Sequence, residues 1–198
     1  MDQNENITID AEKIIPKKEK NFWRELAEII FFVAIVVIPI QTFVGRTFIV
    51  VGSSMYPTFE NKDYLIVDKL TYHFNDPKRG DVIIFHPPID EKTYYIKRII
   101  GLPNETVTVD GNKVIVKTET GEEIVLDEPY RSSDGTSVKT VELSDDEYFV
   151  MGDNRAVSSD SRVWGALPES NISGRAFLRL FPFRSLDAWP GSLDEFNE

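Results

Sequence analysis

The sequence predicts a mainly β domain that follows one apolar helix near the N-terminus. Two observations carry this prediction. After residue 45 the chain contains nine short runs of β-branched and aromatic residues, separated by Gly, Pro, Asn and Asp. No stretch of 12 residues in the same region shows the helical period of apolar residues. The only candidate for a long helix therefore lies before the β-rich region.

Composition excludes several classes of protein. The 198 residues carry 33 Asp and Glu against 22 Lys and Arg, a formal net charge of −11, which argues against a nucleic-acid partner. With 41% hydrophobic residues the chain is typical of a globular protein. It has no Cys and two His, His73 and His86, which are too few for most metal sites. We expect neither a metal nor a cofactor.

The apolar helix is expected over residues 26–44, with an unbroken apolar run from Ile29 to Ile40. At 1.5 Å per residue this helix is about 28 Å long, which matches one bilayer core. A cleavable signal peptide would need a small-x-small site after the run, and none is convincing. A buried core helix would be apolar on all sides with little chain to cover it. We therefore expect a transmembrane anchor.

Charges on either side of this helix predict its orientation. Five basic residues precede it and only Arg46 follows closely. The positive-inside bias then places residues 1–25 in the cytoplasm and the chain from residue 45 outside. The five basic residues are Lys13, Lys17, Lys18, Lys20 and Arg24.

The expected strands follow in chain order. They span residues 46–51, 64–68, 81–86, 94–101, 106–109, 113–117, 124–126, 139–143 and 147–151. A hairpin is expected at Asp110-Gly111-Asn112, because Gly accepts a positive φ at little cost. We expect one domain over residues 45–184, with an inserted β subdomain at about 107–147. A C-terminal tail, 185–198, ends in an acidic segment that we expect to fray from Asp187.

Three polar features stand out in the β-rich region. Residues 51–58, VGSSMYPT, read on their own as an ordinary serine-rich turn. Lys97 lies inside the apolar run YYIKRII, where a lysine on an edge strand commonly prevents aggregation. Residues 152–162 are dense in hydrogen-bonding side chains, as in many polar loops.

Together these features favour nucleophilic catalysis. A serine hydroxyl is a poor nucleophile until a base takes its proton. Lysine is a base only when neutral, which requires desolvation to lower its pKa from about 10.4. An apolar strand provides such surroundings for Lys97, and a Ser–Lys pair needs no histidine.

Four segments in sequence resemble the bacterial type I signal peptidases, in their Gram-positive-like branch. They are residues 52–58 (GSSMYPT), 79–85 (RGDVIIF), 95–105 (YIKRIIGLPNE) and 152–165 (GDNRAVSSDSRVWG). The resemblance implies a serine endopeptidase of the bacterial plasma membrane that removes signal peptides from secretory pre-proteins. Its partners would be those signal peptides and the lipid bilayer. It also implies a β-rich catalytic core shared with the self-cleaving SOS repressors.

The resemblance assigns roles to particular residues. It implies that Ser54 is the nucleophile and Lys97 the general base, that Ser158 orients the lysine amine, and that Asp160 and Arg162 form an ion pair behind the dyad. Where one branch has an oxyanion-binding serine, this chain has Gly52, so the Ser54 backbone N–H is the expected donor, with support from Ser53. The resemblance implies a substrate pocket lined by Phe48, Val50, Met55, Tyr95 and Ile96. Plain core packing is the alternative for each of them, and for Phe48 and Ile96 the two interpretations are about equally favoured.

Two other functions compete with this interpretation. An α/β-hydrolase is disfavoured because the chain has no G-x-S-x-G motif and no alternation of strands and helices around Ser54. A tethered binding domain would keep Ser54 and Lys97 as remnants. The distance between the Ser54 Oγ and the Lys97 Nζ discriminates, since a dyad requires about 2.6–3.2 Å.

Overall fold

The computed structural model describes residues 22–37, 46–90 and 92–192. The chain divides into two compact units, residues 1–38 and 39–198. In the first unit, helix α1 (Phe22–Phe32) continues into a π-helical turn, Val33–Val37. No helix in the described part of the chain combines the length and the apolar character that crossing a bilayer requires. Residues 38–44 of the expected transmembrane helix lie outside the described residues.

The second unit is built on an antiparallel sheet of eight strands, whose order in the sheet differs from their order in the chain. Their order is β1-β2-β11-β3-β4-β9-β10, with β12 paired to β11. The strands are β1 (Arg46–Ile49), β2 (Tyr64–Asp68), β3 (Val82–Phe85), β4 (Tyr95–Gly101), β9 (Glu147–Met151), β10 (Leu167–Pro168), β11 (Ile172–Phe181) and β12 (Asp187–Ala188). The mainly β prediction is confirmed.

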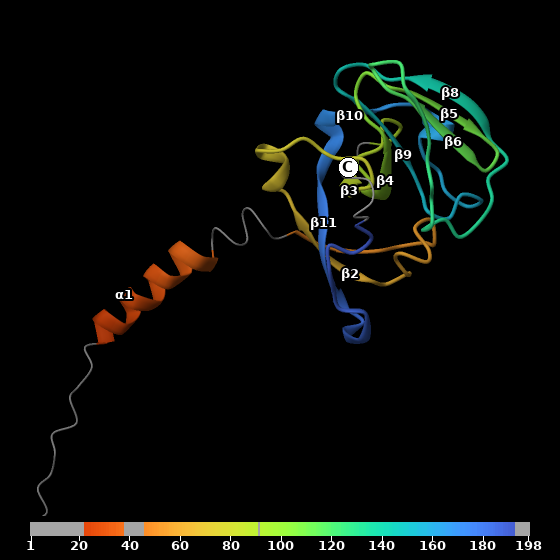
Figure 1. Cartoon of the computed structure of the whole chain (residues 1–198). Coiled ribbons are helices and arrows are strands. Elements are labelled where there is room, and N and C mark those ends of the chain that lie inside the picture. Colours follow the sequence, from red (N-terminus) through yellow and green to blue (C-terminus); the bar gives the residue numbers. More distant parts are fainter. Residues whose placement is uncertain (1–21, 38–45, 91, 193–198) are drawn as a thin grey trace, which may run out of the picture. The chain divides into compact units, whose positions relative to one another are not determined.

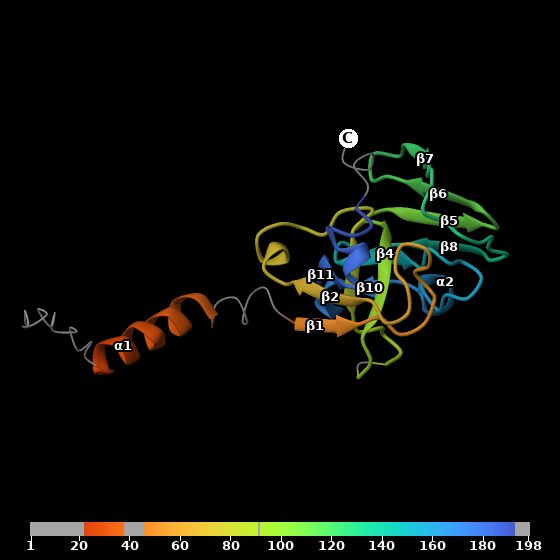
Figure 2. The ribbon, with the colours of Figure 1, turned by 90° about the horizontal axis from the view of Figure 1, so that it is seen from below.

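A second sheet of four strands lies within the expected insert. Its order is β7-β6-β5-β8, and Figure 2 shows these strands as a group beside the main sheet. Its hairpin turn is the predicted one, with Gly111 at φ +58°. The strands are β5 (Thr106–Asp110), β6 (Lys113–Lys117), β7 (Glu123–Val125) and β8 (Val138–Glu142).

All nine expected strands are present, with ends that differ by at most two residues. The sequence analysis missed β10, β11, β12 and the short helix α2 (Ser161–Trp164). Single 3-10 turns at Thr71–His73, Glu169–Asn171 and Phe183–Ser185 complete the described helical elements.

The missed strand β11 is central to the main sheet, because it joins β2 to β3. Its cations are partnered by distant carboxylates: Arg175 contacts Asp81, and Arg179 contacts Asp63. Gly174 has a φ of +152°, and a Cβ there would lie 2.4 Å from the Asp68 carbonyl oxygen. Only glycine allows this close approach of β2 and β11.

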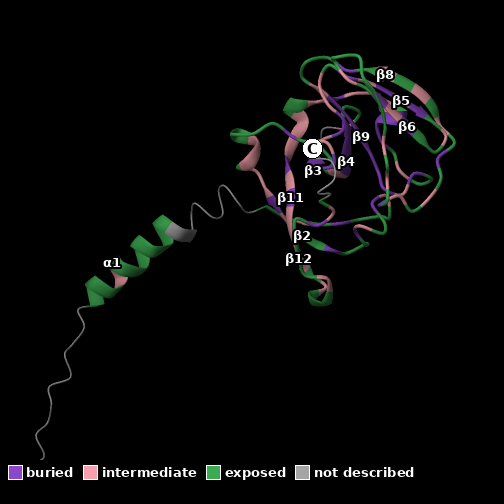
Figure 3. Ribbon diagram, viewed as in Figure 1, coloured by how far each residue is buried: buried purple, intermediate pink, exposed green. Residues whose placement is uncertain are grey.

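Three clusters of buried apolar side chains surround the inner strands, which Figure 3 shows as mostly buried. Strand β3 is buried along its whole length: Val82 and Ile84 face one cluster, Ile83 and Phe85 another. A third cluster joins the second sheet to β4 and β9. A strand buried on both faces is a rigid base for its neighbour β4.

The C-terminal segment differs from the expected frayed tail. Strand β12 pairs with β11, and the Gly191 carbonyl accepts a hydrogen bond from Arg98. The Trp189 ring packs edge-to-face against Phe177, with ring centroids 4.7 Å apart, and lies against the Arg175 guanidinium. These contacts hold the segment through Ser192, where the description ends.

Candidate active site

The structure brings Ser54 and Lys97 together. The Lys97 Nζ lies 2.7 Å from the Ser54 Oγ and donates a second hydrogen bond, of 2.8 Å, to the Ile96 carbonyl. Lys97 is only 4% exposed. The separation is within the range that a proton-transfer pair requires, so the distance criterion favours a dyad over a binding domain with remnant residues.

The end of strand β9 creates the space for this pair. Strand β9 pairs with β4 only from Arg98 onward, because Met151 opposite Arg98 is its last residue. Before that point β4 has β3 on one side and no described strand on the other. The Ser54 loop lies at this unpaired edge.

Buried residues after Ser54 anchor the nucleophile loop. Met55 and Phe59 are in the core, and the Phe59 N–H donates to the Met55 carbonyl over 2.9 Å. On the other side, the Asn154 N–H donates to the Ser54 carbonyl over 3.0 Å. Because both sides of the loop are held, the hydroxyl of Ser54 is fixed relative to β4.

Burial lowers the pKa of Lys97 from 10.5 to about 8, because the charged amine loses its hydration. The charges of Asp160 and Asp153 oppose this shift, and the charge of Arg162 adds to it. In the described part of the chain no carboxylate forms an ion pair with the amine. With a pKa of about 8, about one Lys97 amine in ten is neutral at pH 7, far more than for an exposed lysine, and a base must be neutral.

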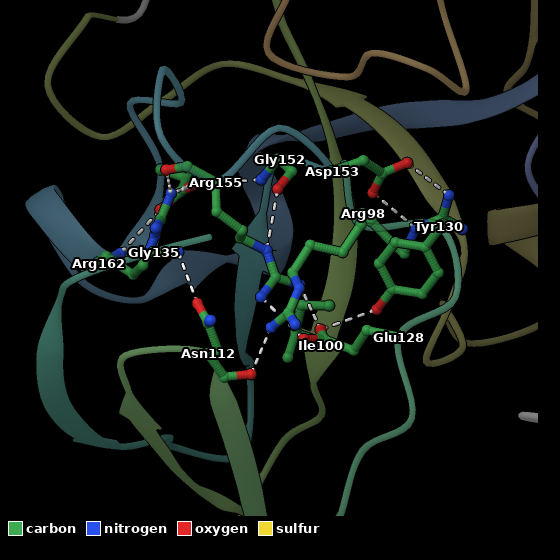
Figure 4. Close-up of polar contacts among 12 residues, drawn as sticks. Arg98, Ile100, Asn112, Glu128, Tyr130, Gly135, Gly152, Asp153, Arg155 and Arg162 are labelled. Carbon is green, nitrogen blue, oxygen red and sulfur yellow. Dashed lines mark hydrogen bonds and ion pairs between the residues drawn. The ribbon is translucent and has the colours of Figure 1, made fainter. Parts of the chain in front are cut away.

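The next residue, Arg98, points to the opposite face of β4 and is fully buried. Its guanidinium binds both oxygens of Asp153, at 2.9 and 2.8 Å, and lies 4.1 Å from the centroid of the Tyr130 ring. Thr58 donates a further hydrogen bond of 2.5 Å to Asp153. Figure 4 shows Arg98 between Asp153 and Tyr130.

Asp160 and Arg162 form a buried ion pair, with a distance of 2.8 Å between the Arg162 Nε and the Asp160 Oδ1. Asp160 also caps helix α2 and accepts the Gly152 N–H at 3.0 Å. The pair thus fixes the start of the loop that carries Asn154.

Ser158 is placed differently from its expected role. Its Oγ is buried and has no hydrogen-bond partner among the described residues, Lys97 included. A Cβ on Gly152 would lie 2.3 Å from this Oγ and 2.5 Å from the Ser54 carbonyl. Ser158 and the nucleophile loop therefore meet at Gly152, and no larger residue fits between them.

Backbone donors are free beside the nucleophile. The Gly52 N–H is used by the Asn61 side chain, at 3.1 Å. Within the described residues, the N–H groups of Ser53 and Ser54 have no acceptor, and neither has the Ser53 hydroxyl. These groups are available for a substrate oxygen.

A cavity of about 700 Å³ opens beside the dyad. Four of the five expected pocket residues line it: Phe48, Val50, Tyr95 and Ile96. The fifth, Met55, is not among the lining residues, because its side chain is in the core and 1% exposed. Residues that were not expected also line the cavity, among them Ile49, Val51, Leu65, Ile84 and Tyr94.

Two residues that support this site, Asp153 and Asn154, were not singled out from the sequence. Their partners, Arg98 and Ser54, are far away in the chain. The polar density of residues 152–162 was the only signal for them. The described residues contain no cluster of His, Asp and Glu that could hold a metal ion.

Comparison with known proteins agrees with this geometry. The family model described as "Signal peptidase, peptidase S26" matches residues 23–181. The chain is 42% identical to a signal peptidase I of Leptolyngbya laminosa over 74% of each chain. It is 34% identical to signal peptidase I of Bacillus amyloliquefaciens, over 89% of this chain and 94% of that one.

A further relative and a solved structure are also similar. A probable signal peptidase I-2 of Synechocystis is 37% identical over 90% of this chain and 82% of that one. A crystal structure of a signal peptidase I from Enterococcus faecalis V583 is 28% identical, with a TM-score of 0.44, covering 51% of this chain and 97% of that one. With a matched family model over most of its length and relatives above 30% identity, the chain belongs to the signal peptidase family, peptidase S26.

Proposed function

We propose that Ser54 is the nucleophile and Lys97 the general base with which this serine peptidase cleaves signal peptides from exported pre-proteins. One observation carries the assignment: the Nζ of a buried lysine with no carboxylate partner in the described structure lies 2.7 Å from a serine Oγ. A general base needs this contact and a pKa near the working pH.

The proposed reaction has two stages. In the first, the neutral Lys97 amine takes the proton of Ser54 as the Oγ attacks the scissile carbonyl, and the resulting ammonium protonates the leaving amine. In the second, the amine, neutral again, takes a proton from water, and the hydroxide attacks the acyl-enzyme. In the first stage Lys97 passes the proton to the leaving amine, and in the second it passes the proton to the departing Ser54 Oγ. No further acid or base is therefore required.

We assign the oxyanion to the free donors beside the nucleophile. The Ser54 N–H is next to the attacking oxygen, and the Ser53 N–H and hydroxyl are also without acceptors in the described structure. Removing a single oxyanion donor typically costs about 3 kcal/mol of transition-state stabilisation. Ser158 stays a candidate for orienting Lys97, because its buried hydroxyl has no other hydrogen-bond partner among the described residues.

The substrate is proposed to bind as an extended strand. The cavity lies between β1, which is the last strand of its sheet, and the unpaired edge of β4 at Tyr95–Lys97. An extended peptide can add hydrogen bonds to such edges. Apolar residues, including Phe48 and Ile96, would then surround the small side chains that precede the cut.

We also propose that residues 26–44 anchor the enzyme in the bacterial plasma membrane, with residues 1–25 in the cytoplasm and the peptidase domain, 45–184, outside. The described part of this segment supports an apolar environment: Ile29, Ile30, Phe31 and Phe32 are 59–66% exposed. So much exposed apolar surface on one helix is typical of lipid contact. The lipid bilayer would hold the cavity near the signal peptides of arriving pre-proteins.

Two measurements test the anchor. The protein should stay in the membrane pellet after extraction at alkaline pH. In spheroplasts, added protease should digest the domain after residue 45 and leave an N-terminal tag intact. Release by alkali, or digestion of the tag, would refute the proposed topology.

The catalytic proposal is tested with a pre-protein that carries an Ala-x-Ala site. The wild-type chain should release a mature product whose N-terminus follows that site, as N-terminal sequencing would show. Ser54→Ala should release none. The matched variant Ser53→Ala keeps the nucleophile and should still release the mature product, at a rate lowered by no more than the loss of one oxyanion donor. Equal cleavage by wild type and Ser54→Ala would refute the assignment.

A further inference from the structure

A stretch of chain in the insert connects the second sheet to the loop of residues 152–160 that carries Asn154, here called the catalytic loop. This return segment, residues 128–135, leads from β7 back towards β8. It contacts three elements of the site: the two buried arginines Arg98 and Arg155, the loop that carries Asn154, and the chain just after the nucleophile. Figure 4 shows the arginine contacts.

The first part of the return segment binds the arginines. Glu128 forms a buried two-point ion pair with Arg155, whose Nε donates to the Gly152 carbonyl over 3.1 Å. Tyr130 donates to Glu128 over 3.0 Å, and its ring covers the Arg98 guanidinium. Gly152 and Arg98 are both adjacent to the dyad in the chain or in space, so these contacts act at the back of the site.

The second part of the segment contacts the nucleophile region directly. The Ser133 Oγ donates to the Asn154 Oδ1 over 2.7 Å and accepts the Ala156 N–H at 3.0 Å. The Ser132 Oγ donates to the Tyr56 carbonyl over 2.7 Å. The Asn154 N–H in turn donates to the Ser54 carbonyl. A short chain of hydrogen bonds therefore runs from Ser133 through Asn154 to Ser54.

The hairpin of the second sheet holds the return segment in place. The Asn112 Oδ1 accepts the Gly135 N–H at 2.9 Å, and the Asn112 carbonyl accepts from Arg131. The Ser137 carbonyl accepts the Gly111 N–H at 2.9 Å. The segment is thus fixed to the second sheet on one side and to the catalytic loop on the other.

We propose that the return segment positions the nucleophile, with Ser133 as the principal positioning residue acting on Ser54 through Asn154. This proposal rests on the assignment of Ser54 as the nucleophile. The insert then has a catalytic purpose, because without it the loop that fixes the Ser54 carbonyl loses its contacts with Glu128 and Ser133. Small displacements of a reacting group are enough to slow a reaction, since attack requires near-contact geometry.

The test compares three variants of the full chain, purified in detergent, on an Ala-x-Ala pre-protein. Ser133→Ala removes two neutral hydrogen bonds and should lower kcat about fivefold with KM unchanged. Ser133→Thr keeps the hydroxyl and should restore kcat. The matched control Thr140→Ala removes the exposed Thr108–Thr140 hydrogen bond of the same sheet, far from the catalytic loop, and should leave kcat unchanged.

A larger perturbation uses Glu128→Gln, which leaves Arg155 without its counter-charge. It should lower kcat about tenfold to a hundredfold in the fraction that folds. If this variant does not fold, the Ser133 series alone decides. The pH dependence of Ser133→Ala should match that of the wild type, because Ser133 carries no charge.

The proposal would be overturned by a kcat for Ser133→Ala equal to that of the wild type. Equal losses in Ser133→Ala and Thr140→Ala, or a change in KM alone, would also overturn it. Failure of the underlying assignment is visible separately. Cleavage that persists in Ser54→Ala would remove the nucleophile itself, whatever the Ser133 variants do.

Discussion

The two faces of strand β4 each bury a cation, but they surround it with different partners. At the front, Lys97 contacts a neutral hydroxyl and a backbone carbonyl. At the back, its neighbour Arg98 is bound by the Asp153 carboxylate and covered by an aromatic ring. Both side chains are nearly inaccessible to solvent. The comparison teaches that burial alone does not make a base: the buried group must also be an amine that can lose its proton and must lack a carboxylate partner.

Replacing Lys97 by the kind of cation found on the opposite face, an arginine, should have the largest effect on activity. We predict that Lys97→Arg lowers kcat/KM about a thousandfold or more, because a guanidinium stays protonated at any usable pH. The measurement is cleavage of an Ala-x-Ala pre-protein by the folded variant. As a control, Arg98→Lys keeps the charge at the back and should retain measurable activity. Substantial cleavage by Lys97→Arg would reject the assignment of the base.

Removing the carboxylate at the back should chiefly affect stability. We predict that Asp153→Asn lowers the free energy of unfolding by about 3–5 kcal/mol, because it leaves Arg98 buried without its counter-charge. Chemical denaturation measures this loss. The exposed pair Arg24–Glu28 offers a control, since Glu28→Gln should cause no measurable change. A similar small effect for Asp153→Asn would show that the pair is better hydrated than its burial indicates.

The pH dependence of the reaction reports on the front region directly. The pKa of Lys97 is lowered to about 8, and the proposed general base is active only when neutral. We therefore predict that kcat/KM rises about tenfold per pH unit below pH 8 and levels off above it. Initial rates at constant ionic strength, over the range in which the protein stays folded, measure this limb. A flat profile down to acidic pH would contradict the prediction.

A smaller effect is expected from the charged groups near Lys97. The charge of Asp160 raises the pKa of Lys97, whereas the charge of Arg162 lowers it. Asp160→Asn removes the first and keeps the second, so we predict that the limb of the pH profile moves to lower pH. The exposed Glu142→Gln is a charge-matched control that should not move the limb. Movement to higher pH would reverse the sign of the proposed interaction.

Most of the strands were predictable because their signals are local, whereas the pairing of Ser54 with Lys97 was expected only from several segments taken together. Each strand run carries its β-branched and aromatic residues in a few consecutive positions. Turn residues such as Gly111 mark the hairpins in the same way. Local patterns of this kind survive folding, since the period of a strand is set by its own backbone.

Strand β11 was not predictable in that way. Gly174, Arg175 and Arg179 interrupt the alternation of apolar residues that marks a strand. Their reasons lie elsewhere in the chain: Gly174 makes room for the Asp68 carbonyl, and the arginines are paired with Asp81 and Asp63. Such residues become intelligible only after distant strands are known to be neighbours.

The return segment was missed for the same reason. Ser133 reaches Asn154, 21 positions later, and Ser132 reaches Tyr56, 76 positions earlier. Single hydrogen bonds over such separations leave no periodic trace in a sequence. The expected contact of Ser158 with the lysine amine stays a prediction, because its hydroxyl is buried without a partner in the described structure.

The early end of β9, which leaves the edge of β4 unpaired, has a consequence for which polypeptides the enzyme can cleave. A backbone that must lie flat along exposed strand edges has to give up its own helix or sheet bonds first. A small-x-small sequence inside a folded protein would therefore not bind to the enzyme, even where its side chains would fit the cavity. Binding in the proposed way favours polypeptides that have not yet folded.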